Sequence, residues 1–205
     1  MRFEKIPKSF FYNNGDNYEK IYKTKGLKLY LVLLKIKNIE DNVYTTKKIL
    51  SELSGLPTNT SRNSKMINDI LEEFQKQSII KLEKDLTNIN INDMIVINMC
   101  QKTNLNWFKL DCKDFEIANN LTDDELAVLF LIRAYKNNKT NTSFLTTENM
   151  GKIISMAKST VVKTINSLVC KGLIIKKGGN PYIDENGNFA KERVHYQYVY
   201  EKRGW

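Results

Sequence analysis

The chain of 205 residues is 41% hydrophobic and 27% charged, which excludes both wholesale disorder and a collagen-like composition. It holds 32 Lys and Arg against 23 Asp and Glu, and the net charge of +9 favours an anionic partner. The longest apolar run, Leu29 to Leu34, is far shorter than the ~20 residues of a membrane span, and we find no secretory signal pattern. We therefore expect a cytoplasmic protein with no membrane partner.

The first half of the chain predicts three helices followed by a hairpin. The helices are expected over 27–36, 45–53 and 61–74, and the strands over 79–82 and 91–99. Thr45 or Thr46 is placed to cap the second helix. The apolar positions of the second and third helices are Ile49, Leu50, Leu53, Ile67, Leu71 and Phe74. A turn at 54–57 separates these two helices.

The second half repeats this order with clearer signals. Thr122 and Glu125 have capping-box spacing at the start of an apolar helix, and Thr146 or Thr147 starts a second helix that breaks near Ser155. A third helix begins near Lys158 and is expected to stop at Gly172. Its apolar stripe is Val161, Ile165, Leu168 and Val169. Strands over 173–177 and 194–200 follow, with turn residues at 178–181 and 184–188 between them.

Helix, helix, turn, helix and hairpin is the plan of the winged helix-turn-helix, in which the hairpin forms the wing. The sequence therefore predicts a mainly α fold with small β-hairpins, an α+β protein made of two tandem winged helix-turn-helix domains. We expect an N-terminal domain over 1–100, a connecting segment over 101–118 and a C-terminal domain over 119–205.

The residues that catalysis needs are scarce. The single histidine, His195, lies in an alternating segment and is expected on a strand surface. The three cysteines, Cys100, Cys112 and Cys170, are widely spaced, which favours reduced structural thiols over a disulfide framework or a zinc site. Phosphate-loop, dinucleotide-binding and nucleophile-elbow motifs are not found in the sequence. We therefore expect no catalysis, no metal and no cofactor.

The charges of the second domain point to nucleic acid. No Asp or Glu occurs between Asn149 and Ile183, whereas six lysines do. A helical wheel places short polar and cationic residues opposite the apolar stripe, as a helix in the major groove of double-stranded DNA requires. The expected DNA-binding residues are Lys158, Ser159, Thr160, Lys163, Asn166 and Ser167, with Lys176, Lys177 and Arg193 on the wing. The alternative is a merely soluble lysine-rich face.

The first domain carries a mixed signal. Its candidate DNA contacts are Thr60, Arg62, Asn63 and Lys65, at the start of the third helix. Acidic residues follow in the same helix and would repel the DNA backbone, namely Asp69, Glu72 and Glu73. Only the first turn is therefore expected to approach DNA. The alternative is a dimerisation surface, so a homodimer through this domain is a second expected partner. The aromatic Phe10, Phe11, Tyr12 and Tyr18 are expected to cover a core or a partner chain.

Two segments resemble known proteins. The stretch Lys158 to Ile174, KSTVVKTINSLVCKGLI, resembles the recognition helix of many bacterial winged-helix proteins, a likeness that implies the fold rather than the biology. The opening Lys5 to Phe11, KIPKSFF, resembles the start of initiator and replisome-loading domains of Gram-positive plasmids and phages. The tandem order resembles plasmid replication initiators, which lay two winged helices on successive turns of an origin repeat.

These observations predict sequence-specific binding of double-stranded DNA without catalysis. The resemblance implies replication initiation, or origin or partition-site binding, in a plasmid or phage, with replication proteins as further partners. A winged-helix transcriptional regulator would share every DNA-facing residue and is the first alternative. The second alternative is an adaptor of a replication complex that binds proteins through its winged helices.

Overall fold

A computed structural model of the chain describes residues 4–7, 10–11, 25–56, 61–100, 107–110, 112–137 and 139–199. These residues form helices and small antiparallel sheets, so the predicted α+β class is confirmed. The chain divides into two compact units. Unit 1 comprises residues 1–10 and 16–115, and unit 2 comprises residues 11–15 and 116–205. The division falls within helix α4 (Cys112–Asn119).

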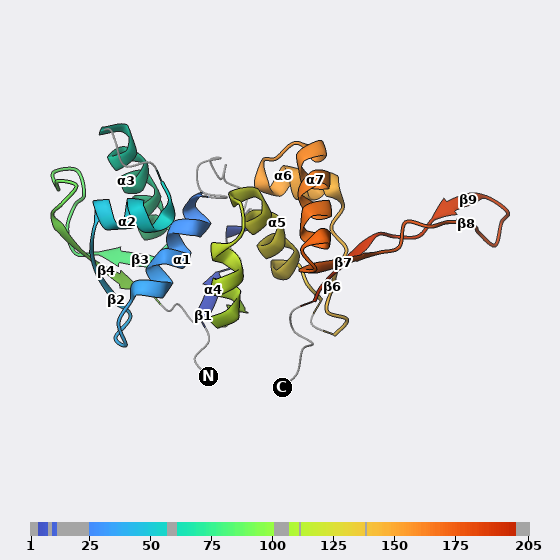
Figure 1. The fold of residues 1–205 in the computed structure, drawn as a ribbon, viewed down its shortest axis with the longest axis horizontal. Coiled ribbons are helices and arrows are strands. Elements are labelled where there is room, and N and C mark those ends of the chain that lie inside the picture. The colour runs from blue at the N-terminus through green and yellow to red at the C-terminus, as the bar shows by residue number, and fades with distance from the viewer. Residues whose placement is uncertain are drawn as a thin grey trace. The chain divides into compact units, whose positions relative to one another are not determined.

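The described residues of unit 1 form three helices, the start of α4 and two small sheets (Figure 1). The helices are α1 (Leu27–Ile36), α2 (Lys47–Ser54) and α3 (Ser61–Lys76). The strands β2 (Asn42–Thr46), β3 (Ile80–Leu82) and β4 (Met94–Met99) form an antiparallel sheet in the order β2-β4-β3. A second sheet pairs β1 (Glu4–Pro7) with β5 (Trp107–Leu110). Residues 107–110, expected as part of a connection, are thus a strand.

The core of unit 1 follows the predicted apolar stripes only in part. Leu50, Ile67, Leu71 and Phe74 are buried, and α1 has the predicted bounds. Ile49 and Leu53, the other two apolar positions of α2, are exposed. Eight residues leave this helix little more than two turns, and its buried face is completed by Lys47, Ser51 and Ser54. Phe10 of unit 1 and Phe11 of unit 2 are buried as expected, whereas Tyr12 and Tyr18 lie outside the described residues.

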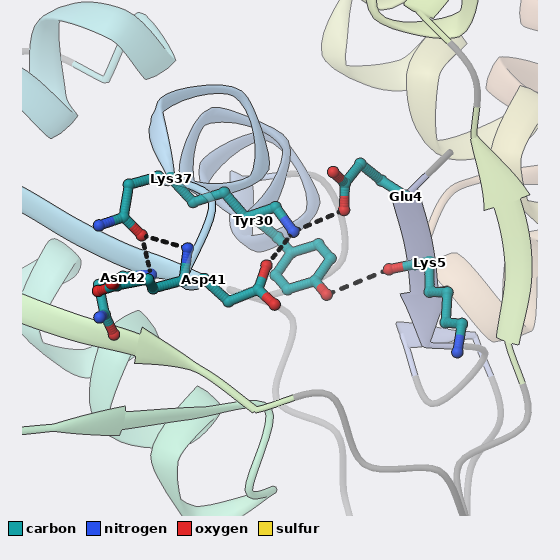
Figure 2. A network of polar contacts seen from close by, with 8 residues as sticks. Glu4, Lys5, Tyr30, Lys37, Asp41 and Asn42 are labelled. Carbon is teal, nitrogen blue, oxygen red and sulfur yellow. Dashed lines mark hydrogen bonds and ion pairs between the residues drawn. The ribbon is translucent and has the colours of Figure 1, made fainter. Parts of the chain in front are cut away.

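A polar network fixes the N-terminal strand of unit 1 to the end of α1 (Figure 2). The Lys37 ammonium pairs with Glu4 of β1 at 2.7 Å and with Asp41, which immediately precedes β2. The Tyr30 hydroxyl donates a hydrogen bond to the Lys5 carbonyl at 3.2 Å. Burial raises the pKa of Tyr30 above its usual range, and the nearby carboxylates of Glu4 and Asp41 add to the shift. The network therefore ties β1 to the helical core.

The described residues of unit 2 form the end of α4, three further helices, one sheet and a long ribbon. The helices are α5 (Asp123–Ala134), α6 (Thr147–Ile154) and α7 (Lys158–Cys170). The strands β6 (Thr142–Ser143), β7 (Ile174–Lys177) and β10 (His195–Tyr198) form an antiparallel sheet in the order β6-β10-β7. Beyond β7 and β10 the ribbon continues through β8 (Pro181–Ile183) and β9 (Phe189–Lys191). Figure 1 shows this ribbon projecting from the helices of the unit.

The two units share one order of elements. In each, a strand after the first helix joins a sheet whose other two strands follow the third helix. The middle position belongs to the last strand, β4 in unit 1 and β10 in unit 2. This arrangement accounts for the repeat that the sequence pattern predicts.

Several predicted boundaries of unit 2 are confirmed. Thr122 and Glu125 form both hydrogen bonds of a capping box, and Thr146 accepts a hydrogen bond from the Asn149 amide as the N-cap of α6. Gly172 follows the end of α7 with φ +68°, in the left-handed region. The strands β8 and β9 were not predicted, because each has only three residues, and Pro181, which was expected in a turn, is the first residue of β8. In the part of the chain that the structure describes, no helix has the length and apolarity to cross a membrane.

Candidate nucleic-acid interface

The helices α6 and α7 are joined by a tight turn. α6 ends at Ile154, and Ser155 adopts the left-handed conformation with φ 52°. A Cβ atom on Gly151 of α6 would lie 2.5 Å from the Met156 carbonyl oxygen, which is too close for any side chain. The backbone of the turn therefore passes directly over α6. This approach sets the start of α7 at Lys158.

The exposed face of α7 carries short polar and cationic side chains. Val161, Thr164, Ile165 and Leu168 are buried on the opposite face. The exposed members of the first three turns are Lys158, Ser159, Val162, Lys163 and Asn166. The predicted positions of Ser159, Lys163 and Asn166 on the outer face are thus confirmed. Thr160 is half-buried, and Val169 is exposed rather than part of the core stripe.

Ser167 differs from its predicted place on the outer face. Its hydroxyl donates a hydrogen bond to the Glu125 carboxylate of α5 at 2.6 Å, and the contact is part-buried. The Lys171 ammonium reaches the other oxygen of Glu125 at 2.7 Å. A residue one position beyond Asn166 on a helix turns by about 100°, which is enough to face α5 instead of solvent. We therefore leave Ser167 out of the candidate interface.

Glu125 is the anchor that holds α7 against α5. Burial alone would raise the pKa of this carboxyl group, but hydrogen bonds from Lys171, Ser167 and Thr122 outweigh burial and lower the pKa to about 2. Glu125 is therefore an anion at neutral pH. One carboxylate caps α5 through Thr122 and fixes the C-terminal half of α7 through two side chains.

The positive charge of the segment 149–183 is less uniform than its sequence predicts. Glu148 pairs with Lys152 at 2.8 Å, and Glu125 pairs with Lys171, so carboxylates from outside the segment neutralise two of its lysines. Within the described residues, Lys163, Lys176 and Lys177 form no ion pair. The available cations are therefore those of the outer face of α7 and of β7.

The base of the ribbon, residues 174–177 and 193–198, adds a second cationic surface. Lys176 and Lys177 are exposed on β7 and pair through the backbone with Tyr196 and His195 of β10. The Arg193 guanidinium lies 5.0 Å from the ring centroid of Phe144, within cation–π distance. The His195 ring lies 5.4 Å from the same ring.

Phe144 is therefore a platform that orients Arg193. Sequence reasoning did not select Phe144, because a lone aromatic residue in a loop before α6 carries no periodic signal. A guanidinium held over an aromatic ring keeps its N–H groups free at the edge, where they can bind phosphate oxygens.

Unit 1 gives a weaker candidate surface. Thr60 lies outside the described residues, and Arg62 and Asn63 lie in the first turn of α3, where the structure describes no side chains. Lys65 is exposed. The acids of the same helix, Asp69, Glu72 and Glu73, are half-buried, so negative charge lies along the helix beyond Lys65.

The comparison with protein families agrees with this geometry. Residues 119–174 match a family model described as a helix-turn-helix domain. The match covers α5, α6 and α7 and ends at the first residue of β7. A comparison with curated proteins gave no match. Unit 2 thus contains a helix-turn-helix domain, and this domain supports DNA binding.

Proposed function

We propose that this protein binds double-stranded DNA of specific sequence, without catalysing a reaction on it, through the outer face of α7 and the base of the ribbon. The observation that carries the proposal is the exposed Ser159, Lys163 and Asn166 face on α7, the last helix of the helix-turn-helix domain. Side chains of these types hydrogen-bond to base edges and phosphates in the major groove, which is wide enough to admit a helix. Lys176, Lys177 and Arg193 then contact the backbone beside the groove.

The shared order of elements supports a further proposal, that each unit is a winged helix. In this view, unit 1 repeats unit 2 in its fold but not in its charge. A tandem protein of this kind suits replication initiation, or origin or partition-site binding, in a plasmid or phage. A transcriptional regulator is the other candidate role. Directly repeated sites would favour the initiator, and inverted half-sites would favour the regulator.

Selection from a random duplex library tests sequence-specific binding directly. The protein is incubated with the library at moderate salt, and bound duplexes are recovered and sequenced over several rounds. We expect one enriched motif of a few base pairs. Recovery of no motif would overturn the proposal of specific binding, whatever the non-specific affinity.

The salt dependence of binding tests the contribution of α7. The logarithm of the association constant, log K, falls linearly with the logarithm of the salt concentration. Each phosphate that the protein neutralises with a cation adds about 0.9 to the steepness of this fall. We expect Lys163→Ala to reduce this slope by about 1 on the selected site. Lys152→Ala is the matched control, because it removes the same charge from a lysine that already pairs with Glu148. Equal slopes for both variants would contradict a phosphate contact by Lys163.

A further inference from the structure

The outer part of the ribbon, residues 178–192, carries apolar side chains that nothing in the described residues covers. In the β8–β9 register Ile183 lies opposite Phe189, and their exposed fractions are 64% and 89%. Directly opposite residues of an antiparallel pair present their side chains on the same face. Tyr182, opposite Ala190, is half-exposed on the other face. The outer ribbon thus presents an apolar pair at its end.

Charge divides the ribbon into two parts. Its base holds Lys176, Lys177 and Arg193 and no carboxylate. The outer ribbon holds Asp184, Glu185 and Glu192 against the single cation Lys191. Carboxylates are repelled by the phosphates of DNA. The base is therefore suited to DNA, whereas the outer ribbon is not.

The outer ribbon is an ordered element and not a loose loop. The Asp184 carboxylate accepts hydrogen bonds from the amides of Asn186 and Asn188 at 2.9 and 2.8 Å, which closes the turn at its end. Where it leaves the base, the Gly179 amide donates to the Glu192 carbonyl at 3.1 Å. At about 3.3 Å per residue, the roughly seven residues of each strand reach about 20 Å beyond the base. The apolar pair thus lies at the far end of the ribbon from its cationic base.

A basic, partly apolar protein surface complements this end, and the chain itself has a net charge of +9. We infer that the outer ribbon docks on a second copy of this chain bound to a neighbouring DNA site. This inference rests on the proposed function, because DNA is what brings the two copies together. Two acidic ribbon ends repel each other, so the contact joins unlike surfaces. Contacts between unlike surfaces are head-to-tail, and directly repeated sites arrange copies in this way.

The test compares binding to one selected site with binding to two directly repeated sites on the same duplex length. We expect the wild-type protein to fill the second site at least about 5-fold more tightly than a single site. The double variant Ile183→Ser with Phe189→Ser should bind the single site normally and lose this cooperativity. Glu185→Lys should also lose cooperativity, because it reverses the charge at the ribbon end. Ile39→Ser is the matched control, since Ile39 is 85% exposed in unit 1.

Each contrary result has a distinct meaning. Non-cooperative binding by the wild type, or cooperativity that survives both ribbon variants, would overturn the inference and leave the proposed function intact. A loss of single-site affinity in the serine variant, or a gain in Glu185→Lys, would place the outer ribbon on DNA and overturn docking between copies. Absence of binding to either duplex would overturn the proposed function and the inference together.

Discussion

Glu125 connects two structures that the sequence separates by more than forty residues. Its backbone and carboxylate complete the capping box of α5, and its carboxylate also binds Ser167 of α7 and Lys171, the C-cap residue of α7. When one partner of a largely buried, charged hydrogen bond is removed, the group left behind keeps its full desolvation penalty without a compensating bond. The position of the candidate recognition helix therefore depends on one side chain of another helix.

Substitution Glu125→Gln should lower the free energy of unfolding by about 1–3 kcal/mol at pH 7. The amide keeps part of the hydrogen bonding but loses the charge that Lys171 and Ser167 stabilise. Urea unfolding at equilibrium measures the change. Glu148→Gln is the control, because its pair with Lys152 is exposed and screened by solvent and should therefore contribute much less to stability. Equal losses in the two variants would contradict the anchoring role of Glu125.

The bonds of the Glu125 carboxylate also make the free energy of unfolding depend on pH. The folded state holds the pKa of Glu125 at about 2, below the ordinary value of 4.5, so ionised Glu125 favours folding. This contribution is complete above about pH 4.5 and is lost as the pH falls from there towards 2. The stability difference between the wild type and Glu125→Gln should therefore shrink over this range. A constant difference from pH 7 to pH 2.5 would be inconsistent with the lowered pKa.

The sequence predicted contacts between residues a few positions apart, but it did not predict side-chain bonds between residues that are far apart in the chain. The capping box of Thr122 and Glu125 needs a spacing of three residues, which the sequence displays. The bonds from Ser167 and Lys171 to Glu125 depend on how α5 packs on α7, which no spacing reveals. For the same reason the acid-free segment 149–183 looked more positive than it is.

At the scale of elements, the turn between α6 and α7 depends on a glycine within a helix. Inside a helix, alanine is more favourable than glycine by about 1 kcal/mol, so Gly151→Ala would stabilise an isolated α6. In the folded unit the new Cβ would meet the Met156 carbonyl oxygen at 2.5 Å. We expect a net loss of about 1–3 kcal/mol, measured by thermal unfolding.

Gly172 supplies the contrast for this prediction. It has a positive φ of +68°, and a Cβ added there would meet no atom within 4 Å, so conformation rather than space requires glycine. Asn tolerates the left-handed region, so Gly172→Asn should be much milder than Gly172→Ala. Gly151→Asn should be at least as harmful as Gly151→Ala. Recovery by Asn at position 151 would argue against a steric cause.

Long elements were easier to predict than short ones. The helices α1, α5 and α7 have apolar stripes over ten or more residues, and all three were expected where they lie. The strand β6 has two residues, and β1 pairs with β5 across about a hundred residues of chain. Neither length nor pairing of this kind leaves a periodic pattern in the sequence.

At the scale of the whole molecule, the two units differ in charge on their third helices. The exposed face of α7 has no carboxylate, whereas α3 carries Asp69, Glu72 and Glu73 beyond Lys65. We therefore expect Lys65→Ala to weaken binding to the selected site less than Lys163→Ala does. Titration of both variants at one fixed salt concentration measures this difference. A larger loss for Lys65→Ala would assign the main DNA contact to unit 1.

Each sheet is completed by strands of its own unit, β2 in the first and β6 in the second. A change that weakens one backbone ladder therefore leaves the hydrogen bonds of the other in place. A gene for such a chain can accumulate substitutions in one half while the other half stays under unchanged selection.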